Sequence, residues 1–122
     1  MTELTESLPL RARLRAALSV AMKRRDRVAA AALRSALGAI DNAEAVDAAE
    51  VNAGAIETSA VGLGVAEARR RELTESDIER IVRAEADERV TVAKEYDSLG
   101  RADRADQLRA EAAALIAHLS AN

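Results

Sequence analysis

The fold of this chain is decided by residues 73–100, LTESDIERIVRAEADERVTVAKEYDSLG, which have the pattern of one long amphipathic helix. Thr74 and Asp77 are spaced as an N-terminal capping box, with aspartate where glutamate or glutamine is usual. Gly100 predicts a left-handed stop, because glycine adopts positive φ without a steric penalty. The apolar residues that share one face are Ile78, Ile81, Val82, Val92, Tyr96 and Leu99.

Two helices are predicted before this segment. In residues 7–25, Ser7 is suited to cap a first helix, and Pro9 falls in its first turn, where a missing N–H costs nothing. Asp26 is suited to cap a second helix, which continues through residues 28–46. The expected core positions of these two helices are Leu10, Leu14, Ala17, Leu18, Ala21, Met22, Leu33, Leu37 and Ile40.

A fourth helix is predicted in residues 101–120. Its expected core positions are Ala105, Leu108, Ala112, Leu115 and Leu119. The links at Asp26 and Gly100 are short, so each joins two antiparallel helices. The sequence therefore predicts an all-α fold, a four-helix arrangement of two antiparallel helical hairpins.

Residues 48–66, AAEVNAGAIETSAVGLGVA, interrupt this pattern, because three glycines lie close together and no clear period is visible. We expect a long flexible loop between the second and third helices, with at most a short helical turn. The 122 residues suit one domain, so residues 1–122 are interpreted as a single helical domain. With no Phe or Trp, aliphatic side chains and alanine must fill its core.

Composition removes several classes of chemistry. The chain has no cysteine, which excludes disulfides, thiol catalysis and thiolate metal ligands. His118 is the only histidine and lies beside the apolar stripe of the last helix, a poor basis for catalysis or metal binding. No glycine-rich phosphate loop or nucleophile motif is present, so we predict no catalytic residue, no cofactor and no metal. No apolar run approaches the length of a membrane span, and we expect a cytoplasmic protein without membrane contact.

The clearest candidate site is AMKRRDR, residues 21–27, which places four basic side chains around one acid. The candidate nucleic-acid-binding residues are Lys23, Arg24, Arg25, Arg27 and Arg34. Guanidinium groups match phosphate oxygens, and the start of the second helix adds its positive dipole end. Alternatively, these cations only stabilise the end of the first helix, by about 0.3–1 kcal/mol each, and keep the turn solvated. Residues 69–71, three arginines, are a second cluster before the cap of the third helix, where a cation gains nothing from the helix dipole. This cluster either reaches a partner or is a solvated run.

A structural polar pair is expected in the bundle. Glu85 and Arg89 lie four residues apart on the apolar face of the third helix, in the favourable order with glutamate first. Glu44 falls near the apolar face of the second helix. We hypothesise that Glu44 or Glu85 meets Arg89 inside the bundle, where such a pair fixes register. The alternative is a solvated pair on the rim of the helix.

The order of several landmarks carries a family resemblance. Residues 21–45 contain AMK, LR, AI and NAE in this order. Residues 73–119 contain a long helix with a central arginine, an aromatic residue near its end and a GRAD turn. Together they resemble the GatB/YqeY family over residues 10–119, apart from the 48–66 loop.

The resemblance implies a helical domain that occurs alone or as the C-terminal part of the B subunit of the amidotransferase for mischarged Glu-tRNA and Asp-tRNA. In that enzyme the chemistry is done elsewhere. Family members continue past the fourth helix into a small second helical module, whereas this sequence stops after IAHLSAN, so we expect that module to be missing.

Three hypotheses of function follow. The first is a non-catalytic accessory or binding module that contacts tRNA or a tRNA-handling enzyme. The second is a protein-interaction or self-associating structural module, a homo-oligomer without a nucleic-acid role, because the alanines of the second helix spread over more than half of its circumference. The third is the family-level label of carbon–nitrogen ligase activity with glutamine as amide donor, for which the sequence offers no nucleophile or nucleotide site.

Overall fold

The computed structural model describes residues 8–58 and 72–119, and every regular element within these ranges is an α-helix. The helices are α2 (Leu10–Arg24), α3 (Arg27–Thr58), α5 (Glu75–Ser98) and α6 (Ala102–Ile116). The all-α prediction is therefore confirmed. The first helix begins at Leu10, so Pro9 lies just before it rather than in its first turn, and Ser7 lies outside the described residues.

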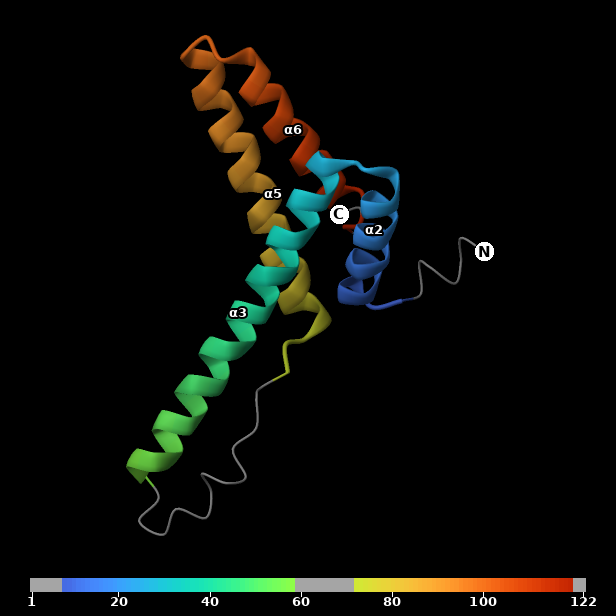
Figure 1. Ribbon diagram of the computed structural model, residues 1–122. Helices are drawn as coiled ribbons and strands as arrows, with labels where there is room; N and C mark the ends of the chain where they lie inside the picture. Colours follow the sequence, from blue (N-terminus) through green and yellow to red (C-terminus); the bar gives the residue numbers. More distant parts are fainter. Residues whose placement is uncertain (1–7, 59–71, 120–122) are drawn as a thin grey trace.

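The helices are arranged as two antiparallel pairs (Figure 1). A two-residue link joins α2 to α3, and a three-residue link joins α5 to α6. Helix α3 contacts α5 and α6 as well as α2, and so joins the two pairs. The tip of the α5–α6 pair and the C-terminal half of α3 extend away from this meeting point in different directions (Figure 1).

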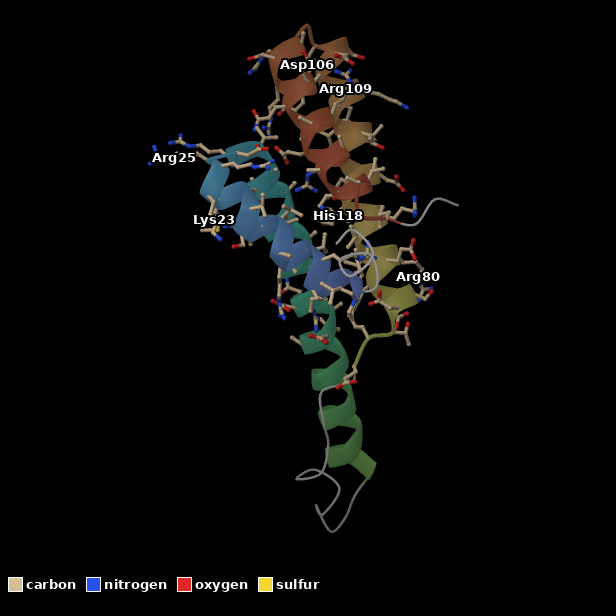
Figure 2. All side chains as sticks on the ribbon, turned by 90° about the vertical axis from the view of Figure 1, so that its right-hand side faces the viewer. Lys23, Arg25, Arg80, Asp106, Arg109 and His118 are labelled. Carbon is tan, nitrogen blue, oxygen red and sulfur yellow. The ribbon has the colours of Figure 1, made fainter. Side chains whose placement is uncertain are left out.

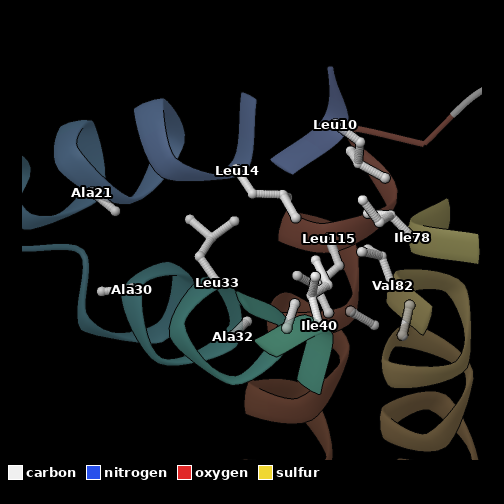
Figure 3. Close-up of a cluster of buried hydrophobic side chains, with 13 residues drawn as sticks. Leu10, Leu14, Ala21, Ala30, Ala32, Leu33, Ile40, Ile78, Val82 and Leu115 are labelled. Carbon is white, nitrogen blue, oxygen red and sulfur yellow. The ribbon is translucent and has the colours of Figure 1, made fainter. Parts of the chain in front are cut away.

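The main core lies where the four helices meet (Figure 3). Its largest fully buried side chains are Leu10, Leu14, Ile40, Leu115 and Val82. Alanines at the contacts, such as Ala32 and Ala36, let the helix backbones approach closely. One predicted core residue is wrong: Met22 is 53% exposed, whereas its neighbour Ala21 is buried, so the core-facing side of α2 ends at Ala21.

A second, smaller core belongs to the α5–α6 pair alone. It contains Ala93, Ala105 and Leu108, with the half-buried Val92 and Tyr96 packed against it. The predicted face of α5 is therefore confirmed, except at its end. Leu99 is 72% exposed, because it caps the helix and no longer follows the helical period.

The start of α5 follows the predicted capping box. The Thr74 side chain accepts from the Asp77 N–H at 3.0 Å, and the Asp77 side chain accepts from the Thr74 N–H at 3.0 Å. These bonds to Thr74 lower the pKa of Asp77 below its ordinary value. The next residue after the cap, Glu75, accepts from the N–H of Leu10 at 2.9 Å, and so ties the start of α2 to α5.

The predicted loop over 48–66 is wrong for its first part, because α3 continues to Thr58. Residues 48–58 contain four alanines, the best helix formers, and only one glycine. That glycine weakens a helix by about 1 kcal/mol, which does not outweigh the favourable neighbours. The other two glycines come after Thr58, and residues 59–66 lie outside the described residues.

Candidate functional site

The turn between α2 and α3 has an unusual residue at its bend. Arg25 has φ 60° and ψ 33°, the left-handed conformation, and is the one non-glycine residue with positive φ in the described ranges. The N–H of Arg25 donates to the carbonyl of Met22 at 3.1 Å, and the N–H of Asp26 donates to the carbonyl of Ala21 at 2.8 Å. This is the Schellman pattern of a helix C-terminus, in which glycine is the favoured residue at the bend.

The five predicted basic residues surround this turn, and we call them the cationic corner: Lys23, Arg24, Arg25, Arg27 and Arg34. All five are exposed. Figure 2 shows Lys23 and Arg25 extending outward from this end of the molecule. No ion pair between the corner and any other described side chain is present.

Two of these arginines share a face of α3. Arg27 is its first residue and Arg34 follows seven positions later, two helical turns or about 10.5 Å along the axis. With Arg25 they line a hollow of about 550 Å³. Ala21 and Ala30, both buried, and the exposed Met22 also line it. We call this the arginine hollow, because three of its lining side chains are guanidinium groups above a small apolar floor.

Asp26 is the one acid of this turn, and its carboxylate already has a partner. Its Oδ1 accepts from the N–H of Ala29 at 3.0 Å, which confirms Asp26 as the cap of α3. The five cations and this carboxylate leave a local charge of +4, in a chain whose net charge is −3. The corner therefore attracts anions although the whole chain is acidic.

The other face of the turn is a different groove. Arg24 lines it with Ala17, Val20, Leu33 and, among others, His118, which lies two residues past the end of α6. Burial and the nearby Arg13 guanidinium lower the pKa of His118, so its ring is neutral at neutral pH. The Arg13 Nη1 also donates to the His118 carbonyl at 2.7 Å, which holds the end of α6 against α2.

The predicted polar pair is present with a different set of partners. Arg89 Nη1 lies 3.2 Å from Glu85 Oε1, and Arg89 Nε donates to Glu111 Oε1 at 2.9 Å. The side chains of Arg89 and Glu111 are 14% and 9% exposed, so the cluster lies nearer the interior than the rim. The Ser35 hydroxyl donates to Glu85 at 2.8 Å and joins α3 to it.

Glu44 does not meet Arg89, which corrects one alternative of the prediction. The Glu44 carboxylate is buried and lies 2.7 Å from Arg11 Nη2, between α3 and α2. Sequence reasoning missed Glu111 as a partner of Arg89. A signal was present, since the two residues lie eleven positions on either side of Gly100, the bend of an antiparallel hairpin.

No helix in residues 8–58 or 72–119 is both long and apolar enough to cross a bilayer. Within the same ranges no three His, Cys, Asp or Glu side chains are grouped so that they could hold a metal ion. The three arginines at residues 69–71 lie outside the described residues.

Comparison of the chain with family models, with curated proteins and with solved structures finds no match in any of the three. The resemblance to the GatB/YqeY family therefore stays a prediction, and the function is inferred from the geometry of the cationic corner.

Proposed function

We propose that the chain is a non-catalytic binding module whose cationic corner contacts the phosphate backbone of a structured RNA. One observation carries this proposal. Five basic side chains gather at a two-residue turn, and none forms an ion pair with another described side chain. Unpaired arginines that are exposed and grouped are suited to phosphate, because their guanidinium forks match its oxygens.

The chemistry favours folded RNA over single strands. Single-strand sites commonly stack bases on aromatic side chains. The only aromatic residue is Tyr96, which lies in α5 with Arg101 and Arg104 over its ring and not at the corner. Contacts to phosphates and to overall shape remain. The family resemblance adds tRNA, or an enzyme that handles it in the cytoplasm, as the expected partner.

Titration of labelled tRNA with the full chain over a series of salt concentrations tests the proposal. Each phosphate contact contributes about 0.7–0.9 to the slope of log affinity against log salt. Replacing Lys23, Arg24 and Arg25 together by alanine is expected to weaken binding about tenfold or more at low salt.

The matched control replaces Arg80, Arg101 and Arg109 by alanine, which removes the same charge elsewhere. Each of these three already pairs with an aspartate. Equal losses in the two triple variants, or no binding of tRNA at low salt, contradict the proposal. Glutamine-dependent amide transfer by the purified chain contradicts its non-catalytic part.

Self-association is a second candidate, favoured by the length of α3. Helix α3 has 32 residues, about 48 Å at 1.5 Å per residue, whereas α2 has 15. The C-terminal half of α3 extends beyond the other helices (Figure 1). A second copy packed along this half gives a dimer in light scattering, and Val46→Glu, at a residue that is exposed in the single chain, weakens it. A monomer at every concentration removes this candidate.

A further inference from the structure

The five side chains of the cationic corner differ in what they line. Arg25, Arg27 and Arg34 line the arginine hollow. Arg24 lines the groove on the other face, and Lys23 lines neither. If the corner only attracted anions at long range, all five cations would contribute about equally to the attraction. Such a role does not require three of them to line one hollow.

The arginine hollow combines space and positive charge that suit a phosphate group. Arg27 and Arg34 stand two turns apart on one face of α3, with Ala30 between them, so no large side chain fills the space. Arg25 adds a third guanidinium from the turn. The volume of about 550 Å³ leaves room for a phosphate and the sugar attached to it.

The backbone conformation of Arg25 is a second argument for a role of the arginine hollow. A left-handed conformation costs an arginine energy that glycine avoids, and such strain tends to persist at functional positions. The turn between α5 and α6 has the same two hydrogen bonds, at 3.1 and 2.8 Å, with Gly100 at the bend. Arginine at the α2–α3 bend therefore is not needed to make the turn.

We infer that the arginine hollow is a discrete site for one backbone phosphate of the bound RNA, while Lys23 and Arg24 contribute only long-range attraction. This inference rests on the proposed function, which supplies RNA as the source of the phosphate. Asp26 also lines the hollow, but its carboxylate accepts from the N–H of Ala29 and the net charge of the lining stays +2. Bidentate hydrogen bonds from arginine forks hold the phosphate in one orientation.

Five single glutamine variants of the full chain, one for each corner residue, test the inference. Glutamine removes the charge, keeps a long side chain and is a good helix former. The first probe is pyrophosphate alone, followed by NMR shifts of backbone amides. We expect shifts at residues 25–34 and about a fivefold or larger loss of affinity in Arg25→Gln, Arg27→Gln and Arg34→Gln, with less than a twofold loss in Lys23→Gln and Arg24→Gln.

The second probe is a labelled duplex RNA, titrated at several salt concentrations. The three hollow variants are expected to lose about tenfold in affinity each, and Lys23→Gln and Arg24→Gln about two- to threefold, with the salt slope falling by about 1 or less. If RNA binds and all five variants weaken it equally, the discrete site is wrong and the proposed function stands. If RNA fails to bind the unmodified chain at low salt, the proposed function is wrong. If pyrophosphate binding is also no weaker in the three hollow variants than in Lys23→Gln and Arg24→Gln, the discrete site is wrong as well.

Discussion

The turns at the ends of the two helical pairs have the same backbone and different charges. Both close with the same pair of hydrogen bonds around a left-handed residue, Arg25 in one and Gly100 in the other. Near the α5–α6 turn Arg101 pairs with Asp103, and Arg109 pairs with Asp97 and Asp106, while Arg104 lies over the Tyr96 ring. At the α2–α3 turn none of the five cations is paired with another described side chain.

This difference separates arginines that form ion pairs within the fold from cations that form none with the described side chains. Figure 2 shows Asp106 and Arg109 together on the α5–α6 pair and Lys23 and Arg25 extending from the other turn. A glycine bend with paired arginines is the arrangement that stability alone favours. The α2–α3 turn departs from it in both respects, and the proposed phosphate binding would account for both departures.

The largest expected effect is in the α5–α6 pair, at Arg89. Arg89→Ala leaves the carboxylates of Glu85 and Glu111 without their cation in a mostly buried setting. Breaking such a cluster costs about 3 kcal/mol of unfolding free energy, the low end of the range for buried pairs, because the side chains retain some exposure. Urea denaturation measures the loss, and a value below about 1 kcal/mol would show that the cluster is solvated.

The corner variant Lys23→Ala/Arg24→Ala/Arg25→Ala is the contrasting control in the same assay. Its side chains are exposed and unpaired, so its unfolding free energy should stay within about 0.5 kcal/mol of the unmodified chain. A loss as large as that of Arg89→Ala would place the corner among the charges that the fold needs.

A smaller effect is expected when the glycine bend is given an arginine. Gly100→Arg places a side chain at φ 74°, where its Cβ meets no atom within 4 Å, so its cost is conformational. We expect a loss of about 1 kcal/mol in unfolding free energy. The added cation should leave the affinity for duplex RNA within about twofold, since a single charge is screened by salt. A gain in RNA affinity as large as the loss caused by Arg25→Gln would mean that the position of the arginine in the molecule does not matter.

The smallest effect is a pH dependence at His118. Its pKa is lowered from the ordinary value of 6.5, first by burial and then by Arg13. Because the unfolded chain binds a proton more readily, stability is fully present above pH 6.5 and falls as the pH drops towards the folded-state pKa. His118→Gln should remove this decline between pH 7.5 and 5.5, measured by urea midpoints. An equal decline in the variant would assign it to other groups.

Much of the fold was predictable because it follows local rules. The capping box at Thr74, the glycine stop at Gly100 and the cap at Asp26 are all confirmed, since each depends on residues within one turn. The predicted end of α3 is wrong, because the three glycines of 48–66 do not have the same effect on the helix. Only the first of them falls within the helix, and its alanine neighbours outweigh it.

The site was predictable as a set of residues and not as a geometry. The five cations of the corner follow from their spacing around Asp26, as does the pair of Glu85 and Arg89. The division between Arg24 and the arginine hollow depends on how two helices cross, and the left-handed state of Arg25 depends on where α2 ends. Neither is encoded in a helical period.

Arg25→Gly tests the central claim most directly, because the two properties that meet at this residue should change in opposite directions. Glycine relieves the left-handed strain, so unfolding free energy in urea should rise by about 0.5–1 kcal/mol. It also removes one guanidinium from the arginine hollow, so affinity for duplex RNA should fall about tenfold at low salt. A more stable variant that binds RNA as tightly as the unmodified chain would contradict the account, since Arg25 would then be only a costly turn residue.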